Sequence, residues 1–149
     1  MEPVSIASVV AGLSLIGGFI VQLLGGADAL LCTLVLFITL DVMMGVFMSI
    51  HHHISKKTKT GRFSSDALWA GLTRKFLCFI VIIIAVALDN LTGIYITTGD
   101  VQITLIRSTV ILFYIAYEAS SILENCALIG LPLPKKLLDV LEILRRDND

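Results

Sequence analysis

The stretch that decides the fold is residues 29–50, which read ALLCTLVLFITLDVMMGVFMSI and contain one charged residue, Asp41. A helix needs about 20 predominantly apolar residues to cross a hydrocarbon core of about 30 Å. This stretch is therefore long enough to span a bilayer as a single helix. The run before it, residues 3–27, has no charged side chain and predicts another span.

The composition of the 149-residue chain also places it in the membrane class. Hydrophobic residues make up 56% of the sequence and charged residues 15%, whereas a soluble domain usually carries about 25% charged residues. Mean hydropathy is +0.92. The net charge of −1 favours no nucleic-acid partner. Cys32, Cys78 and Cys126 show no CxxC spacing and lie in or beside apolar runs, which argues against a disulfide framework or a zinc site.

Two further apolar runs complete the predicted fold, an all-α integral membrane protein with about four transmembrane helices. The predicted spans, in a transmembrane domain of residues 1–130, are residues 4–24, 29–50, 76–98 and 103–128. A basic cytoplasmic loop occupies residues 51–75. The cytoplasmic tail, residues 131–149, contains a short amphipathic helix that begins at Lys135, after a helix break at residues 130–134. Within the loop, Ser64 or Ser65 before Asp66 is a helix-start signal. As an alternative, the chain has three spans and its first run is re-entrant or peripheral.

Basic residues predict the orientation, because Lys and Arg are retained on the cytoplasmic side. The residues expected at this membrane surface are Lys56, Lys57, Lys59, Arg62, Arg74, Lys75, Lys135, Lys136, Arg145 and Arg146. With four spans both termini then lie in the cytoplasm, in a multi-pass protein of the bacterial cytoplasmic (inner) membrane. The amino terminus lacks the positive region of a signal peptide, so we interpret the first run as a retained helix.

Small residues recur at helical spacing in the first run. Ala7 and Ala11 are four residues apart, as are Ser14 and Gly18. This spacing lets helix backbones approach closely in lipid, where association depends on packing. The four residues are therefore candidates for helix packing, although glycine is also tolerated in membrane helices without such a role.

The fourth run carries a polar stripe. At about 100° per residue, one face of this helix presents Arg107, Tyr114, Glu118, Ser121 and Asn125. Lipid cannot satisfy such groups, so the stripe must face protein or water. It is either a sealed hydrogen-bonded seam between helices or the wall of an aqueous lesion, and both are possible if the seam opens.

Two carboxylates lie in the other spans, each followed by glycine four residues later. Asp41 precedes Gly45 and Asp89 precedes Gly93, and the glycine would let a neighbouring helix approach the carboxylate. We expect Arg107 to pair with Asp89 or Asp100 near the outer surface, and Lys75 to extend toward the cytoplasmic interface. The candidates for a pore lining or an oligomer seam are therefore the five residues of the polar stripe together with Asp41, Gly45 and Asp89.

No constellation for catalysis, metal or cofactor binding is evident. The sequence contains no phosphate-binding glycine loop, HExxH motif or nucleophile elbow. His51, His52 and His53 follow a span and precede the basic loop, which favours an interfacial polar cap over a metal site. We therefore predict neither an enzyme nor a cofactor.

The carboxyl-terminal half resembles a known family. The segments that carry the resemblance are YEASSILEN at residues 117–125 and GLPLPKKL at residues 130–137, with Asp41-x-x-x-Gly45, Phe63-Ser64-Ser65 and Gly71-Leu72-Thr73-Arg74-Lys75 before them. Over roughly residues 40–144 the chain resembles the toxin-secretion/phage-lysis holin family.

The resemblance implies a protein that oligomerises with itself in the membrane lipid and opens lesions or pores, without a cofactor. Its functional partner would be an endolysin, released for host cell lysis, or a secreted toxin, with an antiholin as a possible further partner. The glycine-rich first run and Arg107 have no counterpart in the resemblance. Two alternatives fit the same spans: a small proton-coupled multidrug-type transporter, suggested by the intramembrane carboxylates, and an antiholin or structural membrane subunit.

Overall fold

A computed structural model describes residues 5–52, 65–98, 101–137 and 139. Its elements are helices, apart from one short hairpin. The elements are α1 (Ile6–Leu23), α2 (Ala29–Phe47), the π-helical turn η1 (Met48–His52), α3 (Ser65–Thr92), β1 (Tyr95–Thr98), β2 (Val101–Thr104) and α4 (Leu105–Leu128). In the described residues, four helices are long and apolar enough to cross a membrane. The prediction of an all-α membrane protein with four such helices is confirmed.

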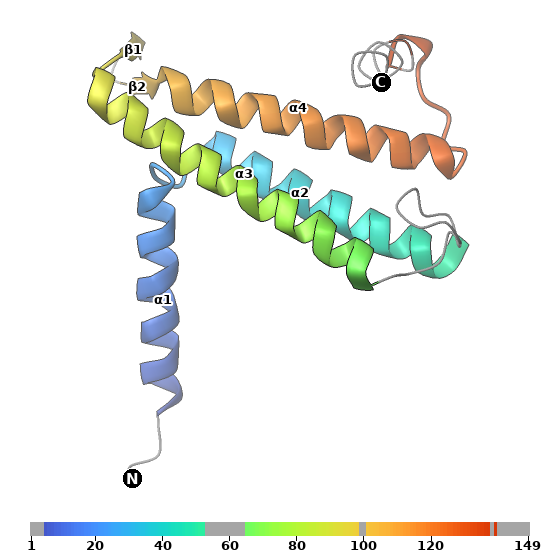
Figure 1. Cartoon of the computed structure of the whole chain (residues 1–149), viewed down its shortest axis with the longest axis horizontal. Coiled ribbons are helices and arrows are strands. Elements are labelled where there is room, and N and C mark those ends of the chain that lie inside the picture. Colours follow the sequence, from blue (N-terminus) through green and yellow to red (C-terminus); the bar gives the residue numbers. More distant parts are fainter. Residues whose placement is uncertain (1–4, 53–64, 99–100, 138, 140–149) are drawn as a thin grey trace.

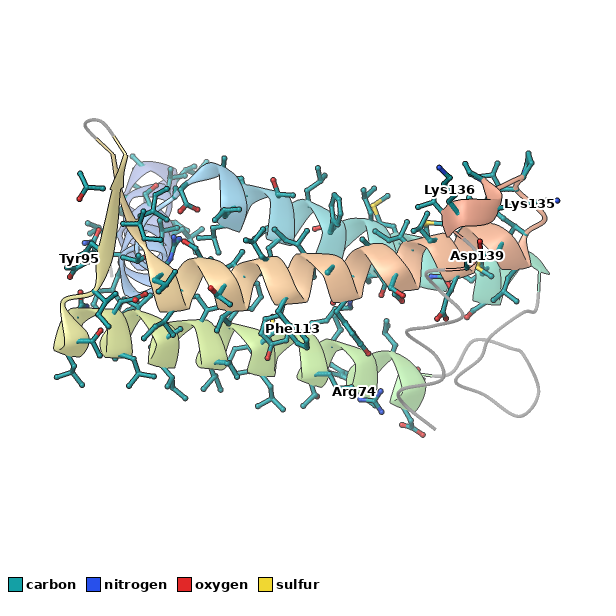
Figure 2. The ribbon with its side chains drawn as sticks, turned by 90° about the horizontal axis from the view of Figure 1, so that it is seen from above. Arg74, Tyr95, Phe113, Lys135, Lys136 and Asp139 are labelled. Atoms are coloured by element: carbon teal, nitrogen blue, oxygen red, sulfur yellow. The ribbon has the colours of Figure 1, made fainter. Side chains whose placement is uncertain are left out.

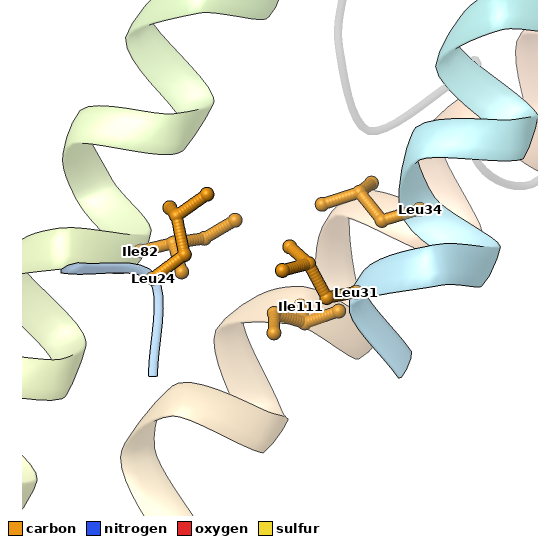
Figure 3. Close-up of a cluster of buried hydrophobic side chains, with 5 residues drawn as sticks. All are labelled: Leu24, Leu31, Leu34, Ile82 and Ile111. Carbon is orange, nitrogen blue, oxygen red and sulfur yellow. The ribbon is translucent and has the colours of Figure 1, made fainter. Parts of the chain in front are cut away.

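Helices α2, α3 and α4 form a bundle in which α4 packs against both of the others (Figure 1). Figure 3 shows the buried cluster at its centre, to which α2 contributes Leu34, α3 contributes Ile82 and α4 contributes Ile111. Leu24 and Leu31 complete the cluster from the connection between α1 and α2 and from the first turn of α2. Most other large apolar side chains are exposed, as expected for a bundle surrounded by lipid.

Helix α1 leaves the end of the bundle and runs away from it (Figure 1). None of its residues is buried, and Ala7, Ala11, Ser14 and Gly18 are all exposed. A Cβ added at Gly18 would meet no atom within 4 Å. Among the described residues of this chain, the small-residue stripe therefore has no helix packed against it.

The third predicted span differs most from the structure. Helix α3 begins at Ser65, in line with the helix-start signal, but ends at Thr92, and the antiparallel hairpin of β1 and β2 follows. In its register Tyr95 pairs with Thr104 and Thr98 with Val101. Gly93, with φ +63°, ends the helix, and the β-branched and aromatic residues after it favour a strand. The predicted helical span to residue 98 is therefore wrong, and so is the extension of the predicted loop to residue 75, because residues 65–75 belong to α3.

Several predictions fall on parts of the chain outside the described residues. These are the positions of Asp100, His53, Lys56, Lys57, Lys59, Arg62, Arg145 and Arg146. Of the predicted tail helix, residues 135–137 and 139 are described, and they are helical. At η1 the structure describes the backbone of His51 and His52 but not their side chains.

Candidate functional site

Charged side chains are buried at two levels of a bundle that is otherwise apolar. Asp41, Asp89, Arg107 and Glu118 each keep 6% or less of their surface exposed. A charged group taken from water must be paired or hydrogen-bonded, because its desolvation is otherwise too costly. Each level of the bundle therefore contains a network of partners.

The first network, here called the Lys75 cluster, consists of Asp41, Lys75, Glu118, Ser121 and Asn125. Lys75 Nζ of α3 lies 3.0 Å from Asp41 Oδ2 of α2 and also donates to Glu118 Oε2 of α4. The side chain of Lys75 is 11% exposed. The cluster thus joins all three helices of the bundle through one cation.

Two neutral side chains of α4 complete the coordination of Asp41. Ser121 Oγ donates to Asp41 Oδ1 over 2.7 Å, and Asn125 Nδ2 donates to the same oxygen over 3.3 Å. Glu118, Ser121 and Asn125 can act together because residues three and four apart share one face of a helix. Asp41 therefore accepts hydrogen bonds from three side chains. Among the described residues, the side-chain donor to the carboxylate of Glu118 is Lys75.

The second network, here called the Arg107 cluster, ties the first turn of α4 to the connection between α1 and α2. Arg107 Nε donates to the carbonyl oxygen of Leu24 over 2.6 Å, and Nη2 donates to that of Gly26 over 3.1 Å. Nη1 donates to Asp28 Oδ2 and forms an ion pair with it. The planar guanidinium thus binds two carbonyl oxygens of the turn as well as one carboxylate.

Asp89 of α3 belongs to the same cluster through the backbone of α4. Its Oδ1 accepts from the amide of Ile106 over 3.0 Å, and its Oδ2 accepts from the amide of Arg107 over 2.7 Å. The first amides of a helix have no partner within the helix, and a carboxylate there also complements the helix dipole. Asp89 consequently acts as a cap for α4 supplied by another helix, since Thr104 makes no side-chain capping bond.

Gly25 is the residue that lets the Arg107 side chain approach the turn. Its φ of +85° lies in the left-handed region, and a Cβ placed on it would come within 2.6 Å of Arg107 Nε. A side chain at this position would collide with the guanidinium. The Gly25-Gly26 sequence therefore serves both the turn and the charge network.

Asp28 is the more exposed member of the Arg107 cluster, with 44% of its side chain exposed. Partial burial raises the pKa of its carboxyl, but hydrogen bonds from Arg107 and from the Leu31 amide outweigh burial, and the pKa lies below its usual value of 3.8. The bond from the Leu31 amide, 2.8 Å long, also makes Asp28 the N-cap of α2. Asp28 was not among the residues predicted from the sequence, although an Asp directly before an apolar run is an N-cap signal.

The structure corrects two expected pairings. The Arg107 guanidinium pairs with Asp28 and two carbonyl groups, while Asp89 binds the backbone amide of Arg107. Lys75 is largely buried in the bundle, because the packing of α3 against α4 directs it to the two carboxylates. In place of the expected extension of its side chain, the structure shows two ion pairs inside the bundle.

The remaining candidates lie outside both clusters. Tyr114 is half-buried and packs against the apolar core. Gly45 is exposed and a Cβ there would meet nothing within 4 Å, so no described helix of this chain approaches the carboxylate at that point. Figure 2 shows Arg74, Lys135 and Lys136 toward one end of the bundle and Tyr95 at the other, and these three basic residues are exposed. Within the described ranges, no group of three His, Cys, Asp or Glu residues could hold a metal ion.

Comparison with known proteins supplies a family. Residues 18–146 match the model of the bacteriophage holin family. The chain is 38% identical over 111 residues to a "probable holin" of Bacillus phage phi105, an alignment that covers 74% of this chain and 76% of the phage protein. It is 35% identical over 133 residues to an uncharacterized 14.9 kDa protein of Clostridium perfringens, covering 89% of each chain. No solved structure matches the chain at a significant level.

Proposed function

The chain belongs to the bacteriophage holin family, and from this premise we propose that it oligomerises in the bacterial cytoplasmic membrane and opens lesions there. Through these lesions a cytoplasmic endolysin would reach the cell wall, or a large toxin would leave the cell. The Lys75 cluster is the observation that carries the mechanism, because it places charged groups inside a unit whose outer surface is apolar.

In the closed state, the cluster is sealed between α2, α3 and α4. A charged residue at the centre of a membrane helix costs roughly 2.5–3.5 kcal/mol on insertion scales, so separation of the three helices in lipid is unfavourable. Separation toward water is different, because hydration replaces the lost partners. The polar face of α4, with Glu118, Ser121 and Asn125, would then form part of a wetted wall.

Helix α1 supports the oligomeric part of the proposal. It is apolar over a membrane-spanning length, yet none of its residues is buried in its own chain. Its small residues, Ala7, Ala11, Ser14 and Gly18, are exposed together. In lipid such a face packs against another helix, and we propose that it does so between copies of this chain.

The orientation follows from the exposed basic residues. Arg74, Lys135 and Lys136 lie toward the end of the bundle opposite the hairpin (Figure 2). Because Lys and Arg are retained in the cytoplasm, we propose that this end is cytoplasmic. The hairpin and the Arg107 cluster then face the outer side. If α1 turns from the direction across the bundle that Figure 1 shows and also spans the membrane, both termini are cytoplasmic.

One experiment tests the proposed function directly. The chain is induced in a bacterium with and without a co-expressed endolysin that lacks its own signal peptide, and membrane potential and culture density are followed. We expect abrupt depolarisation in both cultures and rapid lysis only with the endolysin. Slow growth without either event would refute a holin. If the chain instead delays the lysis that a co-expressed, known holin causes, the chain is an antiholin.

The timing of lysis tests the part assigned to the cluster. Asp41→Asn and Glu118→Gln each replace a titratable carboxyl group by a neutral amide of similar volume, and each should shift the onset of lysis at equal membrane levels. Asp66→Asn is the matched control, because Asp66 is exposed in the first turn of α3. If Asp41→Asn and Glu118→Gln both lyse the culture at the same time as Asp66→Asn, a role for the cluster in opening is contradicted.

A further inference from the structure

The charges of the Lys75 cluster do not balance. Asp41 and Glu118 each bring a carboxyl group, and among the described residues Lys75 is the one cation paired with them. If both carboxyl groups are ionised, the cluster carries one uncompensated negative charge. Such a charge is strongly disfavoured among buried side chains in a bilayer, where an ionisable group neutralises rather than stay charged without a partner.

The position of the cluster removes the usual sources of compensation. Asp41, Lys75 and Glu118 are interior residues of α2, α3 and α4, so the free amides of a helix N-terminus are out of reach. The thiol of Cys78 lies beside Lys75 and Glu118, but a thiol is neutral near pH 7.

The Arg107 cluster shows the contrast. It also combines two carboxylates with one cation, Asp28 and Asp89 with Arg107. Asp89, however, accepts from two amides at the positive end of α4, and Asp28 is exposed enough to be hydrated. Only the Lys75 cluster, among the described residues, leaves a fully enclosed carboxyl group in excess.

The hydrogen bonds indicate which carboxyl group is neutral. Asp41 accepts from Lys75, Ser121 and Asn125, and every such donor stabilises the ionised form. For Glu118, which is 4% exposed, the recorded donor is Lys75. The ionised state is thus better supported at Asp41.

We propose that Glu118 is a proton-binding site, which holds one proton at neutral pH while the bundle is closed and keeps the Lys75 cluster neutral. Opening of the bundle to water would hydrate Glu118 and release this proton. The inference rests on the charges and contacts of the cluster and does not require that the chain forms lesions.

Infrared spectroscopy of the full chain, purified and reconstituted in phosphatidylcholine vesicles, tests the proposal. A protonated carboxyl group absorbs separately from a carboxylate, and its band shifts in D₂O. We expect such a band at neutral pH in the unaltered chain. It should be lost in Glu118→Gln, and also in Asp41→Asn, because Lys75 then balances Glu118 without a proton.

Asp66→Asn is the matched control and should keep the band, since Asp66 is exposed. Circular dichroism of every sample establishes that the helices are intact. The absence of the band from the folded, unaltered chain would overturn the proposal. The charge count predicts loss of the band in both variants, so its survival in either folded Glu118→Gln or folded Asp41→Asn would overturn the charge balance on which the proposal depends.

Discussion

Replacing Lys75 by methionine should destabilise the bundle. The substitution keeps an unbranched side chain of similar length but removes the cation that lies 3.0 Å from Asp41 and is bonded to Glu118. Removing one partner of a buried pair costs about 3–5 kcal/mol, because the other partner remains buried. Ser121 and Asn125 still donate to Asp41, so we expect a loss of ~3 kcal/mol, toward the lower end of that range.

Unfolding in mixed micelles, with an increasing fraction of a denaturing detergent and circular dichroism as the readout, measures this loss. About 3 kcal/mol corresponds to roughly a hundredfold change in the unfolding equilibrium. Arg74→Met is the matched control, because Arg74 is an exposed basic neighbour on the same helix. Its stability should change by less than about 0.5 kcal/mol.

A triple variant separates the loss of charge pairing from a loss of packing. When Asp41→Asn and Glu118→Gln are added to Lys75→Met, no charge remains in the cluster, and neutral replacements of a buried ion pair are often tolerated. We expect most of the lost stability to return. If Lys75→Met is no less stable than Arg74→Met, or if the triple variant recovers nothing, the reasoning from buried charge is refuted.

Three further predictions concern the Arg107 cluster. Gly25→Ala should cost more stability than Gly26→Ala in the same micelle assay. Both glycines have positive φ, which costs a residue with a side chain about 1–2 kcal/mol, but only at Gly25 would the added Cβ also collide with Arg107. Equal losses would contradict this contact. Arg107→Lys keeps the charge but cannot form the fork, and the expected loss is about 1–3 kcal/mol, so an unchanged midpoint would count against the geometry. Because the pKa of Asp28 lies below 3.8, the bond to Arg107 contributes fully above that pH and weakens as the pH falls further. Amide hydrogen exchange in residues 24–28 should show this acid-dependent loosening, and its persistence in Asp28→Asn would exclude Asp28 as the cause.

The helical runs were predictable because membrane insertion depends on local composition. Residues 29–50 predicted a helix that the structure places at Ala29–Phe47 and continues as η1, and residues 103–128 correspond closely to Leu105–Leu128. The end of α3 was not predictable in the same way. Residues 93–98 contain no charged side chain that would mark the end of the span. The hairpin depends on pairing with residues 101–104, and hydropathy contains no information about that pairing.

The members of the polar networks were predictable in part. The spacing of Glu118, Ser121 and Asn125 predicted a shared polar face, and the structure brings all three together around Asp41 and Lys75. Tyr114 has the same spacing but packs with the core. Spacing decides which residues share a face of one helix, and it contains no information about the part of a neighbouring helix that this face meets.

The sequence by itself determined that this chain is a membrane protein with four apolar helices, and that its charged residues inside those helices would need partners. Only the tertiary structure decided which partners these are. Lys75 meets a glutamate 43 residues away, and Arg107 meets an aspartate 79 residues away. The physical reason is that burial makes pairing obligatory, whereas the choice of pair depends on how each helix is rotated and shifted when Leu34, Ile82 and Ile111 pack together.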